Sequence, residues 1–518
     1  MLLALSSLPS PYNIGDLGKG AENFLDFLES SGQSWWQILP LGPTSIIFGN
    51  SPYMSYSAFG GNPLLISPDL LLTDGLLKPT DLPAPIGSEY LTDYPRATAE
   101  KQITLHRAHE RFRHDKSCQD MLAEFTSQHP WLNDHALFLA LKEKFNNKPW
   151  YEWPSEYRVR VSGTLSSAGR ILTERVNYFS FEQYVFFKQW QRLHTLAKQK
   201  NISIIGDLPI YVAADSVDVW ANQMIFQLDP ITRKPSHIAG VPPDYFSATG
   251  QRWGNPLYRW NDPDASIENQ LYDWWAKRLR ATFSQVDAVR IDHFRGFESY
   301  WRIRAEEKTA INGTWVKGPG LNFFREMEKR VGKLPIIAED LGIITPEVEE
   351  LRDTLEFPGM KILLFAFDGH VENPYLPYNH IQNCVVYTGT HDNDTVLGWY
   401  MSPEVAEDEK KRARAHANRA DSQSTAINDD FIHLALSSPA RLSILPLQDI
   451  LGFGNDCRMN TPSTMGNNWS WRCAPRFLSS ANGARLRERT EFFGRLQHIK
   501  FPSNNQDEDL DASPASQL

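Results

Sequence analysis

The chain has 518 residues, of which 41% are hydrophobic and 22% are charged, proportions typical of a globular protein with a large buried core. Its formal net charge of −10 argues against a nucleic-acid binder, and no apolar run approaches the ~20 residues of a membrane-spanning helix. The apolar start has no basic flank, so we expect no signal peptide. Four cysteines are too few for a disulfide framework, and no zinc-ligand spacing is present. We therefore expect a cytoplasmic protein.

Short runs rich in Ile, Val and Leu recur along the chain and are typical of strands that are buried on both faces. The eight runs are 35–41, 63–67, 203–208, 287–292, 335–339, 361–367, 385–388 and 442–447. Helix-like segments separate many of them, at 20–30, 181–200, 269–283, 322–331, 346–354 and 404–420. The alternation predicts an α/β fold with a parallel sheet, and eight strands predict a closed (β/α)₈ barrel. With one strand fewer, the sheet would be open.

The uneven spacing of these runs predicts two insertions. Well over a hundred residues separate the second run from the third, and they contain amphipathic stretches near 99–114 and 132–145. We therefore expect a mainly helical subdomain at about 68–180. A second excursion at about 209–269 is rich in Gly, Pro and aromatic residues. The catalytic unit is expected to span 1–503, and the acidic stretch 504–518 is expected to be a disordered tail.

Three of the predicted strands deliver a carboxylate to the barrel end where active sites lie. Asp292 ends the fourth run, Glu339 ends the fifth, and Asp392 follows the seventh. Arg290 shares a strand face with Asp292, and its guanidinium favours the ionised carboxylate that a nucleophile needs. Glu339 follows an apolar run, so we expect desolvation to raise its pKa and let it hold a proton.

A single carboxylate at a strand end most often caps a helix or pairs with a loop cation. Three at one barrel mouth, flanked by Arg290, His293 and His391, favour a carboxylate-based active site. Two carboxyls in unequal environments suit retaining glycoside chemistry. The spacing alone leaves sugar, phosphate and enolate chemistry open, including that of a Mg²⁺-dependent barrel enzyme.

Long blocks of sequence around these residues carry a more specific signal. The blocks are 7–18 (SLPSPYNIGDLG), 35–43 (WWQILPLGP), 50–53 (NSPY), 206–212 (GDLPIYV), 240–246 (GVPPDYF) and 250–256 (GQRWGNP). The sequence resembles the 4-α-glucanotransferases of glycoside hydrolase family 77, also called amylomaltases, from residue 7 to about residue 500. The resemblance implies a (β/α)₈ barrel with inserted subdomains, without a C-terminal β-sandwich or extra N-terminal domains. It also implies transfer of α-1,4-glucan segments between maltodextrins.

The same resemblance implies the roles of individual residues. Asp292 matches the nucleophile, Glu339 the general acid/base and Asp392 the transition-state stabiliser of a retaining double displacement. Such a mechanism requires the first two carboxyls to lie ~5–5.5 Å apart. The expected ligands are α-1,4-glucans and glucose or maltose acceptors, with no metal, cofactor, nucleic acid, membrane or obligate protein partner. The expected substrate-binding residues are Tyr53, Asp207, Arg290, His391, Asp244, Phe246, Gln251, Trp253 and Asn460.

The segment 240–256 is predicted to cover the cleft. It has Gly and Pro hinges and carries Tyr245, Phe246 and Trp253, so it could position acceptor sugar and limit water. An ordinary surface loop is the alternative. Two rival functions stay open at this point: a retaining α-glucan hydrolase of the amylase type, and a non-catalytic glucan-binding protein. The three intact carboxylates argue against the second.

Overall fold

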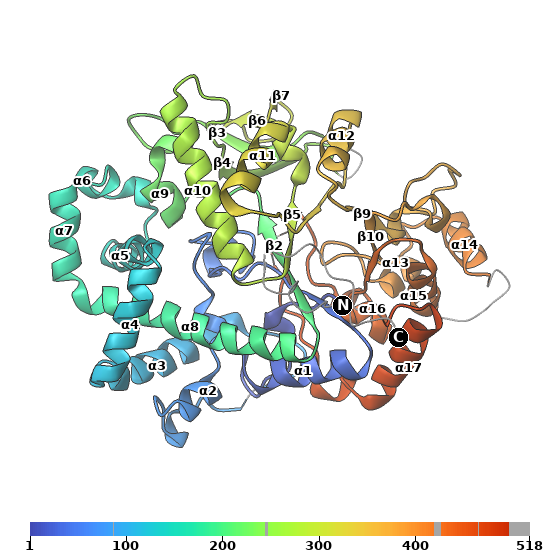
Figure 1. Ribbon diagram of the computed structural model, residues 1–518, viewed down its shortest axis with the longest axis horizontal. Helices are drawn as coiled ribbons and strands as arrows, with labels where there is room; N and C mark the ends of the chain where they lie inside the picture. Colours follow the sequence, from blue (N-terminus) through green and yellow to red (C-terminus); the bar gives the residue numbers. More distant parts are fainter. Residues whose placement is uncertain (86, 244–246, 419–425, 465, 497–518) are drawn as a thin grey trace, which may run out of the picture.

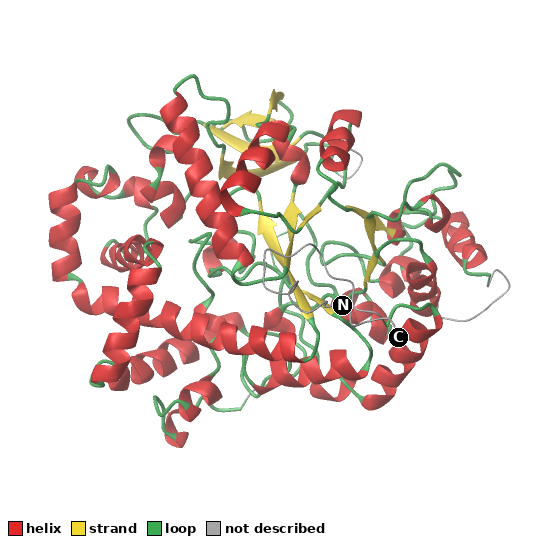
Figure 2. Cartoon of the chain, viewed as in Figure 1, coloured by secondary structure: helices red, strands yellow, loops and turns green. Residues whose placement is uncertain are grey.

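The computed structural model describes residues 1–85, 87–243, 247–418, 426–464 and 466–496. The predicted tail at 504–518 and the predicted sugar-binding residues Asp244 and Phe246 lie outside these ranges. Within them the chain has a mixed α/β fold, in which parallel strands run through the middle and helices surround them (Figure 1 and Figure 2). No helix in the same ranges is both long and apolar enough to cross a membrane.

Seven of the eight predicted apolar runs overlap a parallel strand. One sheet has the order β1-β2-β5-β8, and a second has the order β11-β10-β9. Most residues of these strands are buried, which explains why the runs are apolar throughout rather than alternating. The strands are β1 (Trp35–Gln37), β2 (Ser203–Pro209), β5 (Ala288–Asp292), β8 (Ile336–Ala338), β9 (Gly359–Ile362), β10 (Cys384–Tyr387) and β11 (Leu442–Ile444).

The predicted strand at 63–67 is wrong. Residues Pro63–Leu65 form a 3₁₀ turn, because proline fixes its own φ and the Asn62 side chain accepts a hydrogen bond from the Leu64 amide at 3.1 Å. The run at 361–367 is a strand only to Ile362, where β9 ends and a second 3₁₀ turn follows.

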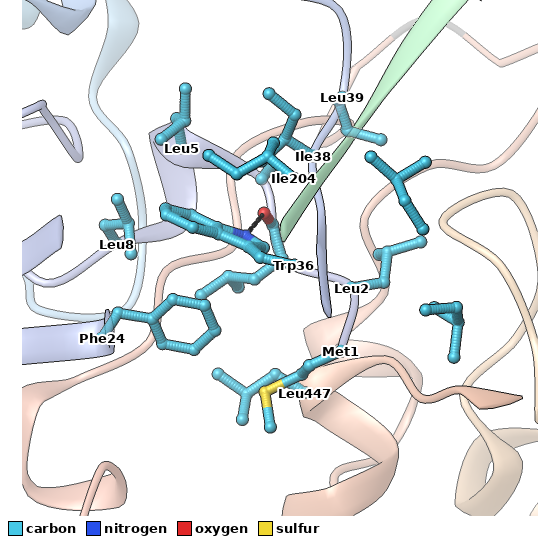
Figure 3. Close-up of a cluster of buried hydrophobic side chains, with 14 of the residues drawn as sticks. Met1, Leu2, Leu5, Leu8, Phe24, Trp36, Ile38, Leu39, Ile204 and Leu447 are labelled. Atoms are coloured by element: carbon cyan, nitrogen blue, oxygen red, sulfur yellow. Dashed lines mark hydrogen bonds between the residues drawn. The ribbon is translucent and has the colours of Figure 1, made fainter. Parts of the chain in front are cut away.

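The predicted closed barrel is not present, because the parallel strands in the described part of the chain form two separate sheets. Short contacts lie where the two sheets approach each other, at β8 and β9 and at β1 and β11. The Ala338 amide donates to the Pro358 carbonyl at 2.9 Å, beside β8 and β9. Leu2 forms isolated parallel bridges with both Gln37 and Pro446, so it lies between β1 and the end of β11. Figure 3 shows this region as a buried apolar cluster, in which the Trp36 indole donates to a backbone carbonyl at 2.9 Å.

Helices occupy most of the positions where the sequence predicts them. The helices α1 (Lys19–Ser30), α10 (Ala265–Phe283), α11 (Gly320–Val331) and α12 (Pro346–Thr354) contain the predicted segments, whereas α14 (Glu407–His416) is shorter than predicted. Near the C-terminus lie α13 (Val396–Met401), α15 (Ile427–Ser437), α16 (Leu447–Leu451) and α17 (Ser480–Phe492).

The chain between β1 and β2 is largely helical and forms the left part of the view in Figure 1. Its last helix, α8 (Thr173–Gln199), begins before the predicted segment and leads directly into β2. The other helices of this stretch are α2 (Pro68–Thr73), α3 (Tyr94–Phe112), α4 (Lys116–Gln128), α5 (Trp131–Lys144), α6 (Ser155–Arg158) and α7 (Ser162–Ile171), and the short α9 (Val217–Ala221) follows β2.

An antiparallel sheet of order β4-β3-β6-β7, at the top of the view in Figure 1, is absent from the sequence predictions. Its strands are less buried and more polar than the parallel ones, so no apolar run marks them. The sheet joins the hairpin of the second excursion to the chain that follows β5. Its strands are β3 (His237–Val241), β4 (Gln251–Pro256), β6 (Ser299–Arg304) and β7 (Gly313–Lys317).

Candidate active site

Two of the predicted carboxylates follow paired residues of neighbouring strands. Asp292 is the last residue of β5, and Glu339 directly follows β8. Ile291 and Ala338 are register partners, and the Glu339 amide donates to the Ile291 carbonyl at 3.1 Å. The strands are parallel, so Asp292 and Glu339 leave the sheet at the same edge, the carboxyl ends of the strands.

Backbone amides fix the Glu339 carboxylate. One of its oxygens accepts from the His293 amide at 2.6 Å and the other from the Leu341 amide at 3.0 Å. His293 has a φ of +60°, a left-handed conformation that costs a residue with a side chain some strain. This turn immediately after Asp292 directs the amide of His293 at Glu339. His293 therefore links the two carboxylate residues, since it follows Asp292 in the chain and donates to Glu339.

Arg290 lies at the centre of the charged network. It is the register partner of Asp207 on β2, and its guanidinium donates to both Asp207 oxygens at 2.8–3.1 Å. The same guanidinium donates to Asp292 at 3.2 Å. The Arg290 and Asp207 side chains are almost fully buried, whereas 33% of the Asp292 side chain is exposed and open to a ligand.

The Tyr53 hydroxyl connects the strand residues to the loop after β10. It donates to Asp207 at 2.7 Å and lies 2.8 Å from Nε2 of His391. The Tyr53 and His391 rings stack with centroids 5.3 Å apart and planes 9° apart, and Trp469 lies against both at 5.8–6.0 Å. One face of the Tyr53 ring is therefore taken by a protein side chain.

Asp392, the third carboxylate, is held at both its side chain and its backbone carbonyl. The Asn460 amide group donates to Oδ1 at 2.6 Å, and Oδ2 lies 3.3 Å from Nε2 of His391. Arg458 donates to the Asp392 carbonyl at 2.6 Å and also pairs with Asp394. The Asp392 side chain is 43% exposed, so a ligand can reach it. Asn460 thus contacts a carboxylate that the sequence singles out, and Arg458, two residues before it in the same block, is missed by the sequence predictions.

Burial raises the pKa of both strand-end carboxyls. The pKa of Glu339 rises to about 7, against the effects of Arg290 and of the two backbone amides. Burial also raises the pKa of Asp292 well above its usual value, and the carboxylates of Asp207 and Glu339 add to this, whereas Arg290 lowers it. The predicted effect of Arg290 is present but smaller than that of burial.

The hairpin of β3 and β4 lies next to these residues. The Trp253 ring packs edge-on against the His293 ring with centroids 4.8 Å apart, and its indole donates to the Gln251 side chain at 3.0 Å. Trp253 therefore contacts the residue that follows Asp292, and Gln251 contacts Trp253, while Asp244 and Phe246 fall outside the described residues. A pocket open to solvent is lined in part by Tyr53 and Asp207, and Asp292, Glu339 and Asp392 are not among its lining residues.

Known proteins resemble this chain over nearly its whole length. A family model described as 4-alpha-glucanotransferase matches residues 3–478. A 4-alpha-glucanotransferase from Synechocystis sp. is 49% identical over 501 residues, which cover 96% of this chain and 97% of that protein. One from Thermus thermophilus is 45% identical over 506 residues, 96% of this chain and 98% of that protein. The solved amylomaltase from Streptococcus agalactiae, in complex with acarbose, has a TM-score of 0.90 at 38% identity and covers 96% of this chain and 99% of its own.

Proposed function

The chain belongs to the 4-alpha-glucanotransferase family, glycoside hydrolase family 77, and has that family's transferase activity; from this premise we propose a double displacement through a covalent glycosyl-Asp292. An oxygen of Asp292 attacks the anomeric carbon of a bound α-1,4-glucan. The bond to the departing oxygen breaks as that oxygen takes the proton of Glu339. The reducing-side segment, which carries that oxygen, leaves, and the rest of the glucan stays covalently bound to Asp292.

The second displacement runs in the opposite sense. The 4-hydroxyl of an acceptor glucose or maltodextrin gives its proton to the Glu339 carboxylate, and its oxygen attacks the same carbon. The bond to Asp292 breaks, and the free carboxylate is regenerated. Two inversions leave the configuration at the anomeric carbon unchanged.

The observation that carries this proposal is the placement of Asp292 and Glu339 at the ends of paired parallel strands, joined by the contact from the His293 amide to Glu339. The raised pKa of Glu339, about 7, supports a group that can give and take a proton near neutral pH. The contact from Arg290 to Asp292 supports an ionised Asp292, because it opposes the rise in the pKa of Asp292 that burial causes.

Asp392 is proposed to hydrogen-bond the hydroxyls of the distorted sugar ring, with the strongest contact as positive charge develops at the anomeric carbon. Its exposure and its fixation by Asn460 support this role. Tyr53, Asp207, Arg290 and His391 would then keep the network rigid, and Tyr53, the least buried of them, would contact sugar.

The hairpin of β3 and β4 is proposed to limit water at the covalent intermediate and so to favour transfer over hydrolysis. The contact of Trp253 with His293, the residue after Asp292, supports this. The donors would be maltodextrins and fragments of starch or glycogen, and the relative solved with acarbose supports α-glucan binding in this fold.

We also propose a finer architecture for the barrel and a cellular location for the protein. The chain around Leu2 would complete an eight-stranded barrel, since it bridges both β1 and the residue that follows β11 by two positions. The catalytic unit would reach residue 503, with insertions at 68–180 and 209–269. The four cysteines are all free, which supports a cytoplasmic location.

Incubation with maltotriose tests the proposed chemistry. The wild type should form glucose and a ladder of longer maltodextrins at a nearly constant number of reducing ends. A hydrolase would raise the number of reducing ends, and a binding protein would leave maltotriose unchanged. Acid quenching during turnover, followed by peptide mass analysis, should find the mass of one or more hexose units, two when glucose is released from maltotriose, on the peptide that carries Asp292. Hexose on a different carboxylate would overturn the assignment of the nucleophile.

A further inference from the structure

Asp449 is a buried carboxylate outside the group that contacts substrate in the proposed mechanism. It lies on α16, and only 1% of the residue is exposed. Its Oδ2 accepts a hydrogen bond from the Thr388 hydroxyl at 2.5 Å, and its Oδ1 accepts one from the Val396 amide at 2.8 Å. Thr388 is the first residue after β10, and Val396 is the first residue of α13. One carboxylate therefore joins the end of a strand to the start of a helix.

These two contacts enclose the loop that carries Asp392. Residues 389–395 connect Thr388 to Val396, and Asp392 stands four positions from each of the two. Because both ends bind the two oxygens of one carboxylate, the base of the loop is closed at a single point. A shift of Asp449 would move both ends of the loop together.

The anchor is itself fixed to the fold. The side chain of Asn428, on α15, donates to the Asp449 carbonyl at 3.0 Å. A second asparagine supports the same loop end, since the Asn455 side chain accepts from the Thr395 amide at 3.1 Å. The loop base is thus connected through Asp449 to a packed helix rather than to solvent.

A carboxylate is a costly choice for this position. No ion pair with Asp449 is recorded in the described ranges, and burying a charge without a counter-ion is unfavourable. The two hydrogen-bond donors account for the choice, because a carboxylate offers an acceptor to both Thr388 and Val396. An asparagine would give Val396 an oxygen but would turn an N–H group toward Thr388, whose hydroxyl would then have to rotate and accept that hydrogen bond.

We propose that Asp449 is a positioning residue, which fixes both ends of the loop 388–396 and thereby sets how far Asp392 reaches toward the sugar. The inference rests on the proposed role of Asp392 as transition-state stabiliser. A loosened loop should still let substrate bind but should weaken the contact that strengthens as the reaction proceeds. The loss should therefore fall on kcat rather than on KM.

The experiment compares four variants in the full chain, with maltotriose as substrate. Thr388→Val keeps the shape of residue 388 and removes its hydroxyl, Thr388→Ser keeps the hydroxyl, and Asp449→Asn removes one acceptor. Asp16→Asn is the matched control, because Asp16 is also buried and accepts from one backbone amide at 2.9 Å and one hydroxyl at 3.3 Å. We expect Thr388→Val and Asp449→Asn to lower kcat about 10- to 100-fold, the effect of a misplacement of about 1 Å, with KM within about twofold.

Thr388→Ser should keep nearly the wild-type kcat, and Asp16→Asn should keep it even where its unfolding midpoint falls as much as that of Asp449→Asn. A wild-type kcat in both Thr388→Val and Asp449→Asn would overturn the inference, and so would an effect confined to KM or an equal loss of kcat in the Asp16 control. Wild-type transfer and its loss in Asp292→Asn are measured first. Failure of that first measurement would overturn the proposed function, whereas failure of the loop variants alone would overturn only the role of Asp449.

Discussion

The two halves of the candidate site hold their carboxylates in different ways. Asp292 and Glu339 stand at the ends of paired strands, where the sheet register and backbone amides fix them. Asp392 lies in a loop five residues past the end of β10, and side chains from distant segments hold it. The groups proposed to exchange a bond and a proton are thus built on the most rigid elements. The group proposed to grip a distorted ring is built on a loop that depends on its anchors.

The two halves also differ in how charge is balanced. In the strand half, the Arg290 guanidinium lies between Asp207 and Asp292 and offsets part of their negative charge. In the loop half, the neutral amide of Asn460 makes the short contact with the Asp392 carboxylate. Changes in the strand half should therefore alter both charge and chemistry, while changes in the loop half should mainly alter position.

The largest effect is expected from Asp292→Asn, which removes the proposed nucleophile. We expect transfer to fall by about 10⁴-fold or more, as for other enzymes that form a covalent intermediate. The control is Asp287→Asn, at the opposite end of the same strand run, where the carboxylate binds His194 at 3.1 Å and the Ile204 amide at 2.8 Å. Maltotriose turnover measures both variants. Activity in Asp292→Asn near that of the Asp287 control would remove Asp292 from the chemistry.

Glu339→Gln comes next and tests the proton. We expect a loss of about 10²- to 10⁴-fold, the usual contribution of general acid–base catalysis. The pKa of Glu339 is raised to about 7, and the first step needs the protonated form. The kcat/KM of the wild type should therefore fall as the pH rises through about 7, and the variant should lose this decline. A decline of the same shape in Glu339→Gln would assign it to another group.

The strand half of the site could be predicted from the sequence because its signal is local. An apolar run that ends in a carboxylate predicts both a buried strand and the edge at which the side chain lies, as for Asp292 and Glu339. Asp392 gives the same signal through the run that precedes it, but the anchors of its loop give none. Arg458 and Asp449 lie more than 50 residues from Asp392, and only the folded chain brings them to the same loop. Their roles follow from contacts that no periodicity records.

The errors in the fold prediction have several origins. Pro63–Leu65 is apolar enough for a strand, but a proline and an asparagine cap make it a 3₁₀ turn. The antiparallel sheet is exposed on much of its surface, so polar residues hide its strands, β7 above all. Leu2 connects β1 to the end of β11 through one isolated bridge on each side, and a single residue leaves no pattern in the sequence.

A smaller effect is expected from Asn460→Ala, which removes one anchor of the loop half. Loss of the 2.6 Å contact to the Asp392 carboxylate should cost about 1–2 kcal/mol of transition-state stabilisation, or roughly tenfold in kcat. Asn468→Ala is the control, because Asn468 lies in the same segment but accepts from the Thr461 amide instead. Steady-state kinetics with maltotriose would separate the two variants. Equal losses would mean that the segment as a whole, rather than the contact with Asp392, supports activity.

The smallest effect on rate, but a selective one, is expected from Trp253→Ala. Removing the ring that packs on His293 should admit water beside the proposed intermediate, which raises hydrolysis relative to transfer by a few fold without removing either carboxylate. Trp315→Ala is the matched control, since Trp315 lies on β7 of the same antiparallel sheet and is 41% exposed. The ratio of new reducing ends to released glucose, measured with maltotriose, reports the partition directly. An unchanged ratio in Trp253→Ala would mean that water is limited by the strand half of the site itself, and the hairpin would then serve only to shape the cleft.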